Sequence, residues 1–176
     1  MTNEVLKAME ERRSCRRYKP DPVAPDVLQQ VVRAGLFAAS GMGKQSAIIV
    51  CVTDPALRNR LSAMNAAIGG WDDGFDPFYG APAVLVVLAD KNVPTHVYDG
   101  SLVMGNLMLA AHTVGLGSCW IHRAKEEFDS DEGRAILREC GIEGDWEGVG
   151  HCVLGYPAAA LPQAAPRKEN RVFYAK

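Results

Sequence analysis

The 176-residue sequence has no long apolar run and no strong excess of charge of either sign. Its longest apolar run, residues 81–89, is far too short to cross a bilayer and contains Pro82, so no membrane-spanning segment is expected. The formal net charge of −2 argues against nucleic-acid binding, which needs an extended basic surface. Residues 1–19 are charged and lack an apolar stretch, so we expect no signal peptide and a cytoplasmic location.

Cysteine and histidine are present without the spacings that mark disulfide frameworks or metal sites. The five cysteines include no CxxC pair, and an odd number of them fits reduced thiols in the cytosol. Cys51 and Cys152 lie in apolar, strand-like runs and are expected to be buried. The four histidines show neither HxH nor HExxH spacing, so we expect no metal site and interpret His112 and His151 as structural. The acidic run 72–76 lacks the glutamate that would complete a calcium loop.

The common motifs of catalysis and nucleotide binding are also missing. There is no GxSxG and no P-loop, and the glycine pair at 115 and 117 follows a helix and precedes a strand, the reverse of a dinucleotide-binding fingerprint. No acid–base machinery is evident either. We therefore expect a bound cofactor that carries the chemistry.

Four arginines stand within six residues near the N-terminus: Arg12, Arg13, Arg16 and Arg17. Such a cluster repels itself unless an anion is bound. The guanidinium fork suits a phosphate group, and Ser14 adds a small hydroxyl donor. The alternative is a solvated helix end, where cations interact favourably with the helix dipole. The residues alone leave both interpretations open.

The pattern of apolar residues predicts one domain of helices and strands, followed by an extended arm at about residues 161–176. Expected helices cover residues 3–13, 25–35, 55–64, 101–114 and 131–140, and expected strands cover 47–53, 82–89, 118–121 and 149–154. Helix 101–114 is apolar nearly all round, which is typical of a helix in a domain centre or an interface. Strand 82–89 is continuously apolar, as in strands covered on both faces.

Four segments, in this order, resemble motifs of the nitroreductase family of flavin enzymes. Residues 12–23 (RRSCRRYKPDPV) resemble its opening RRSxRxF…PV, and residues 38–45 (AASGMGKQ) resemble its APSGxNxQPW loop. Residues 106–121 (NLMLAAHTVGLGSCWI) resemble its NLxLAAxxxGLGSCWI unit, and residues 154–157 (LGYP) resemble its last strand. Because these motifs span nearly the whole chain, the sequence is identified as a member of this family.

The resemblance implies an α+β fold with a mixed central β-sheet flanked by helices. It implies a homodimer that holds FMN at the subunit interface. It also implies ping-pong hydride transfer from NADH or NADPH to the flavin, and then to a nitroaromatic, a quinone or a related small organic acceptor.

The resemblance further implies ten cofactor-binding positions: Arg12, Arg13, Ser14, Arg16, Gln45, Asn65, His122, Arg123, Arg167 and Lys168. The first four fall on positions that bind the FMN phosphate and ribityl chain, and the last two fall on phosphate contacts near the C-terminus. Gln45 falls in the loop that meets the flavin from the partner subunit. The turn at residues 122–123 falls where backbone N–H groups face the flavin N5 edge, and Asn65 falls at the polar edge of the ring. The alternatives are an exposed loop residue for Gln45 and a helix-end cap for Asn65.

The sequence departs from the family pattern near the expected substrate pocket. Gly43 replaces the usual Asn, Ser46 and Ala47 replace Pro-Trp, and His122 replaces Gly. These changes leave FMN binding expected and predict an unusual acceptor. Other flavin reactions on the same fold stay open: reductive dehalogenation, enoate reduction or flavin fragmentation. A non-enzymatic flavin or nucleotide binder, and an adaptor that binds a phosphorylated partner, are further alternatives.

Overall fold

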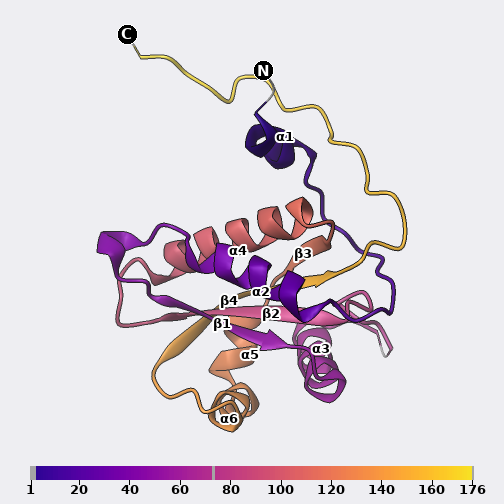
Figure 1. The fold of residues 1–176 in the computed structure, drawn as a ribbon. Helices are drawn as coiled ribbons and strands as arrows, with labels where there is room; N and C mark the ends of the chain where they lie inside the picture. Colours follow the sequence, from indigo (N-terminus) through magenta and orange to yellow (C-terminus); the bar gives the residue numbers. More distant parts are fainter. Residues whose placement is uncertain (1–2, 73, 176) are drawn as a thin grey trace.

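The computed structural model describes residues 3–72 and 74–175. Figure 1 shows one central sheet with helices on both of its faces. In chain order the elements are α1 (Glu4–Glu11), α2 (Pro25–Leu36), the 3₁₀ turn η1 (Gly41–Gly43), β1 (Ala47–Val52), α3 (Pro55–Gly69), β2 (Ala83–Asp90), α4 (His96–Thr113), β3 (Gly117–Ile121), α5 (Ala124–Asp129), α6 (Asp131–Glu139) and β4 (Trp146–Gly155).

Helix starts follow the local capping signals in the sequence. The Asp54 side chain accepts a hydrogen bond of 2.8 Å from the Leu57 N–H, and Pro55 occupies the first position of α3. Gly70 ends this helix with a left-handed φ of 63°. Like Asp54, Asn3 caps the start of its helix: its side-chain Oδ1 accepts a hydrogen bond of 2.9 Å from the Val5 N–H at the start of α1. These caps confirm the predicted starts of both helices.

The sheet has the strand order β1-β2-β4-β3, and its named strands all pair antiparallel. The predicted α+β class is confirmed. The parallel component of the expected mixed sheet is confined, in the described residues, to an isolated bridge between Ser14 and Ser118. Seven consecutive residues of β2, from Ala83 to Ala89, are buried, as predicted for a strand covered on both faces.

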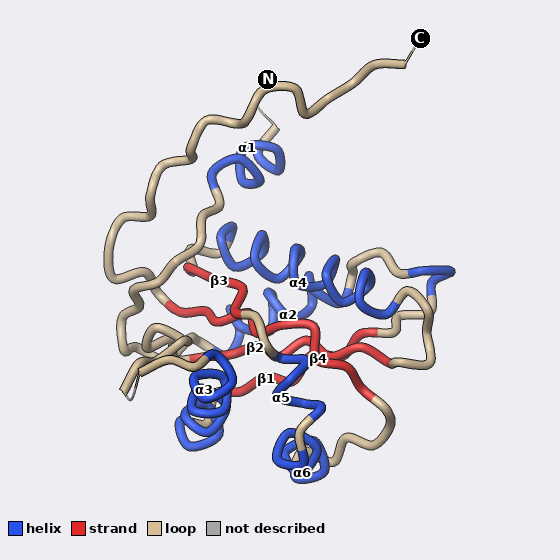
Figure 2. Tube along the Cα trace, turned by 180° about the vertical axis from the view of Figure 1, so that it is seen from behind, coloured by secondary structure: helices blue, strands red, loops and turns tan. Residues whose placement is uncertain are grey.

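Each face of the sheet carries its own apolar core. On one face α2 and α4 cover the sheet, and Met104 and Leu107 of α4 join Leu85 and Val87 of β2 in one apolar cluster. On the other face α3, α5 and α6 pack over the intervening β2 side chains, which are Val84, Val86 and Leu88. Figure 2 shows the same division from behind, with α1 lying outside α4. The side-chain alternation of β2 therefore supplies both cores.

Several element boundaries and one burial prediction differ from expectation. Helix α3 ends at Gly69 rather than residue 64, α4 begins at His96 rather than residue 101, and β4 begins at Trp146 rather than residue 149. The six-residue helix α5 was not predicted. Cys152 is buried as expected, but the prediction for Cys51 is wrong, because its side chain is exposed. The reason is that β1 is an edge strand whose residues are mostly only half-buried.

A broad apolar surface remains uncovered on the side of α4 that faces away from the sheet. Tyr98 of α4 is 74% exposed and Leu102 is 51% exposed. Residues 161–175 form no helix or strand, and Phe173 in this arm is 85% exposed. Figure 1 shows the arm running past α1, away from the sheet.

No helix within residues 3–72 and 74–175 is both long and apolar enough to cross a membrane.

Candidate functional site

The arginine-rich segment lies against the edge strand β3. The Cys15 N–H donates to the Ser118 carbonyl at 2.8 Å, and Ser14 forms an isolated bridge with Ser118. The Tyr18 hydroxyl donates to the Cys15 carbonyl at 2.7 Å. Burial raises the pKa of Tyr18 above its ordinary value, so the hydroxyl remains a neutral donor. The segment is thus fixed to the sheet by its backbone, which leaves its arginine side chains available for a ligand.

Two of these arginines carry buried nitrogen atoms without a hydrogen-bond partner. They are Nη1 of Arg12 and Nε of Arg13. Within the described residues, no carboxylate forms an ion pair with Arg12, Arg13 or Arg16. A buried donor without an acceptor costs about 1–3 kcal/mol. A bound anion would supply an acceptor for such nitrogens, whereas a solvated helix end leaves their burial unexplained.

A cavity of about 250 Å³ adjoins this segment. One wall consists of Ser14, Cys15, Arg16 and Arg17, and the other is formed by residues 159–162 at the start of the C-terminal arm. The exposed Arg16 and the hydroxyl of Ser14 therefore border the same space. This arrangement can hold a phosphate group through charged hydrogen bonds.

The loop at residues 40–46 is anchored by the buried carboxylate of Asp99. Oδ2 of Asp99 accepts from the Ser46 hydroxyl at 2.6 Å, and Oδ1 accepts from the Gly41 N–H at 2.9 Å. Thr95 donates a third hydrogen bond of 3.1 Å. Burial alone would raise the pKa of Asp99, but these three hydrogen bonds outweigh it and hold the pKa below its usual value.

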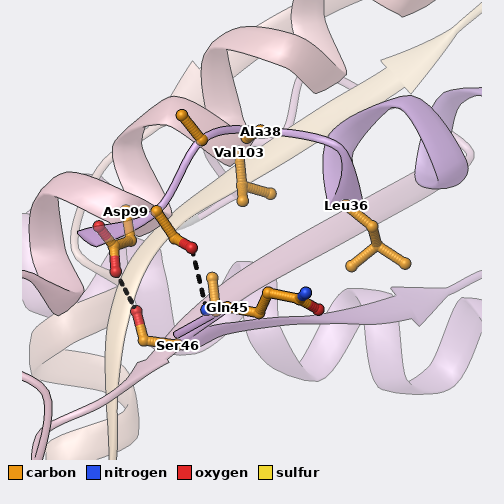
Figure 3. Close-up of a pocket in the computed structure, with 9 residues that line it drawn as sticks. Leu36, Ala38, Gln45, Ser46, Asp99 and Val103 are labelled. Atoms are coloured by element: carbon orange, nitrogen blue, oxygen red, sulfur yellow. Dashed lines mark hydrogen bonds between the residues drawn. The ribbon is translucent and has the colours of Figure 1, made fainter. Parts of the chain in front are cut away.

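The same loop lines a small cavity of about 70 Å³, which Leu36 at the end of α2 and Asp99 and Val103 of α4 also border. Figure 3 shows the Gln45 side chain extending along this cavity toward Leu36, with the Ser46–Asp99 hydrogen bond beside it. Gln45 itself is exposed and has a left-handed φ of 49°. None of the other nine predicted positions lines this cavity. Within one chain, Gln45 is therefore not part of the cavity next to Arg16.

The turn between β3 and α5 contains two more predicted residues, His122 and Arg123. His122 is exposed, and Arg123 has a left-handed φ of 78°. The Arg123 guanidinium lies over the Trp71 ring, with 5.6 Å between its carbon and the ring centroid. Asn65 reaches this turn from α3, and its amide donates to the His122 carbonyl at 2.8 Å. The structure thus brings three of the predicted residues together.

The last two predicted residues, Arg167 and Lys168, are exposed on the C-terminal arm. The Arg167 guanidinium donates to the carbonyl of Ala165, two residues earlier. Neither residue lines the cavity beside Arg16 of the same chain. A contact between this basic pair and a shared phosphate would therefore require either movement of the arm or a second chain.

The sequence reasoning missed Asp99 and Glu127, both fully or almost fully buried. Asp99 preceded the helix predicted at residues 101–114, and Glu127 lies in the helix that was not predicted. A lone acid just before an apolar helix was a usable signal for Asp99. Glu127 offered no such signal, because its partner Asn65 is 62 positions away in the sequence.

The described fold agrees with comparisons to known proteins. The family model "Nitroreductase family" matches residues 9–156, so the chain belongs to the nitroreductase family. The structure of a nitroreductase with bound FMN from Bacteroides fragilis is similar, with a TM-score of 0.89, 27% identity and coverage of 99% of this chain and 100% of that one.

Two curated relatives carry names that refer to nicotinamide-dependent reduction. A protein of Archaeoglobus fulgidus, named as an NADH dehydrogenase or NAD(P)H nitroreductase, is 29% identical over 161 residues, which cover 88% of this chain and 86% of that protein. The FMN reductase [NAD(P)H] of Bacillus subtilis is 27% identical over 140 residues, or 66% of this chain. The match spans only 53% of the length of that relative.

Proposed function

We propose that this protein is an FMN-dependent oxidoreductase that takes electrons from NADH or NADPH and reduces a small organic acceptor. The observation that carries the proposal is the arginine-rich segment: Arg12 and Arg13 hold buried, unpartnered nitrogens, and Ser14 and Arg16 of the same segment line a cavity of about 250 Å³. The family membership and the FMN in the similar Bacteroides fragilis structure support it. The names of the two curated relatives support NADH or NADPH as the donor.

The residues of the arginine-rich segment fit the phosphate end of FMN. Arg12, Arg13, Ser14 and Arg16 would hold the phosphate and ribityl chain, since guanidinium groups bind phosphate oxygens in a bidentate manner. The bound flavin would supply hydride and electron transfer. The protein itself then needs only to orient the ring and to provide hydrogen bonds around it.

The remaining predicted residues fit a site that two chains complete. The uncovered apolar surface on α4 and α1, with the extended arm, supports a homodimer. In such a dimer Gln45 and the pair Arg167 and Lys168 would approach the flavin of the other subunit. The turn at residues 122–123 would face the ring from the same subunit as Arg12.

We place the protein in the cytoplasm, where its five free cysteines would stay reduced.

The acceptor is proposed as a nitroaromatic, a quinone or a related compound. The small residues Gly43 and Ala47 stand where the family pattern has larger ones. They would leave more room in the pocket. Reductive dehalogenation, enoate reduction and flavin fragmentation are the alternative reactions for the same scaffold.

The decisive experiment is chemical identification of the cofactor. The purified protein should be yellow, and chromatography of the pigment released on denaturation should give FMN. Anaerobic NADH or NADPH should bleach the yellow colour, and a panel of nitroaromatics and quinones should restore it. FAD or no flavin would contradict the cofactor assignment. A bound FMN that neither nicotinamide bleaches would favour a non-enzymatic flavin binder.

A further inference from the structure

Three polar side chains lie fully buried beneath the β3–α5 turn. Asn65 comes from α3, Glu127 from α5 and His151 from β4, and each is 0% exposed. Phe78 and Phe128 flank His151, with ring centroids 5.1 and 6.4 Å from its own. Polar groups in such apolar surroundings lower stability unless they are paired. Their presence here calls for a role other than general stabilisation.

The three side chains form a chain of contacts that ends at the turn. Asn65 Nδ2 donates to Glu127 Oε1 at 2.5 Å and to the His122 carbonyl at 2.8 Å, which uses both of its hydrogens. Glu127 Oε2 lies 3.0 Å from His151 Nε2, close enough for an ion pair although poorly angled for a hydrogen bond. The position of His151 on β4 is fixed by strand pairing, because it lies opposite Ile121 of β3.

The contact between Asn65 and His122 determines which way the next peptide group faces. The described chain contains no cis peptide bonds, so the His122 carbonyl and the Arg123 N–H point in opposite directions. Because Asn65 draws this carbonyl into the core, the Arg123 N–H faces outward. Within the described residues this N–H makes no hydrogen bond to the backbone or to a side chain. It is thus a free donor fixed at the surface of the turn.

The turn needs such support because of its backbone conformation. Arg123 has a φ of 78°, which costs a non-glycine residue roughly 1–3 kcal/mol. An unsupported turn would relax by flipping the 122–123 peptide. The buried contacts oppose that flip.

We propose that Asn65 is a positioning residue, oriented by Glu127 and His151, that presents the Arg123 N–H to the ring of the bound flavin. This inference rests on the proposed function, because the ring must lie against the turn. It assigns Asn65 a role behind the turn instead of a direct contact with the polar edge of the ring.

The test compares Asn65→Ala with Ser62→Ala. Ser62 lies on the same helix, is 6% exposed and donates to Asp76 at 2.6 Å, but does not contact the turn. Titration of the FMN-free proteins should show that Asn65→Ala weakens FMN and riboflavin equally, by about 10-fold, since the lost contact is at the ring. Ser62→Ala should lower Tm about as much as Asn65→Ala does, but should leave the affinities for FMN and riboflavin within about twofold of wild type.

Two further measurements separate positioning from general destabilisation. Amide hydrogen exchange of the FMN-free protein should be faster at residues 122–124 in Asn65→Ala and unchanged there in Ser62→Ala. Glu127→Gln keeps an oxygen acceptor for Asn65 and should retain flavin affinity, whereas Glu127→Ala should behave like Asn65→Ala. If Asn65→Ala does not fold, Asn65→Ser, which is too short to reach His122, takes its place.

Several results would overturn the inference. One is an Asn65 variant that loses Tm but keeps wild-type affinity for both flavins. Another is a loss confined to FMN, which would place the effect at the phosphate. Loss of affinity in Glu127→Gln equal to that in Glu127→Ala would show that charge, not geometry, is required. A wild-type chain that binds neither flavin contradicts the proposed function instead, and the exchange measurement still tests the turn.

Discussion

The four arginines near the N-terminus do not share one environment. Arg12 and Arg13 are half-buried and each holds a buried nitrogen without a partner, whereas Arg16 is exposed at the mouth of the adjoining cavity. The first two are therefore prepositioned by the fold. Arg16, like Arg17, is exposed, so its removal should disturb the fold itself little.

Replacement of Arg16 by alanine should weaken FMN binding about 10- to 100-fold and leave riboflavin binding unchanged. A hydrogen bond to a charged group contributes about 1.5–3 kcal/mol, and riboflavin lacks the phosphate. Flavin fluorescence titration measures both affinities. Lys19→Ala is the matched control, because Lys19 is an exposed cation of the same segment that does not line the cavity. Equal losses for both ligands would remove Arg16 from the phosphate.

Acid should destabilise the protein in part through Asp99. Its pKa is lowered in the folded state, because hydrogen bonds outweigh the effect of burial. The unfolded chain therefore binds more protons, and stability rises with pH through this range. The contribution of Asp99 to the free energy of unfolding is complete above the ordinary aspartate pKa of about 3.9. It is lost as the pH falls through the lower pKa that Asp99 has in the folded protein.

Urea unfolding at a series of pH values measures this effect. Asp99→Asn should flatten the decline in the free energy of unfolding below about pH 4, relative to wild type. Asp21→Asn, at an exposed position, should leave the decline unchanged. If the free energy of unfolding of wild type and of Asp99→Asn declines identically at low pH, other carboxylates cause the loss of stability in acid.

At the scale of single residues, the sequence was sufficient where a pattern is local. The arginine cluster and Ser14 are contiguous, so residue type alone was enough to mark them as a candidate phosphate site, which stays a prediction. His151 was interpreted as structural, and it is fully buried. The contact of Asn65 with the His122 carbonyl could not be predicted, because it joins residues 57 positions apart through the packing of α3 on the β3–α5 turn.

At the scale of elements, strong stop and start signals gave correct boundaries. Pro25 and Pro55 begin α2 and α3 as expected, and Asp54 caps the second of these. Helix α5 was missed because six residues are too few to show an apolar period. The start of α4 was misplaced because Asp99, a buried acid on this helix, interrupts the apolar pattern that marked residues 101–114.

Close packing of β4 against α5 makes Gly148 intolerant of a side chain. A Cβ atom at Gly148 would lie 2.1 Å from the Ala124 carbonyl oxygen, and backbone cannot move aside cheaply. Gly148→Ala should lower stability by about 1–3 kcal/mol. Thermal unfolding should show a lower Tm, with Glu126→Ala, exposed on the same helix, as control. An unchanged Tm would contradict the close approach of these elements.

At the scale of the whole molecule, large apolar side chains are exposed on α1, on α4 and on the C-terminal arm. Val5, Leu6 and Met9 of α1 are exposed, as are Tyr98 and Leu102 of α4. Helix α1 lies outside α4 (Figure 1), and Val5 borders the same hollow as Leu109 of α4. Large exposed apolar patches mark interaction surfaces. A second copy of this chain is the proposed cover, because it would also bring the arm and its basic pair to the other site.

Deletion of residues 161–176 should therefore loosen the dimer, lower Tm and release FMN together. The deletion removes Arg167 and Lys168 and the apolar residues Val172, Phe173 and Tyr174, which have little to pack on within their own chain. Light scattering reports the oligomeric state and flavin fluorescence reports the released cofactor. A truncated chain that is monomeric, folded and still yellow would show that one subunit builds the site alone.

The order of strands in the sheet has a consequence for the growing chain on the ribosome. β4 is the last strand to be synthesised, yet it lies between β2 and β3. The apolar strand β2 therefore waits for its central neighbour while residues 91–145 are added, which takes about 3–11 s at 5–20 residues per second. Throughout that interval one edge of β2 is open and β3 has no strand to pair with. The nascent chain is thus most open to aggregation through these unpaired strand edges before β4 has been added.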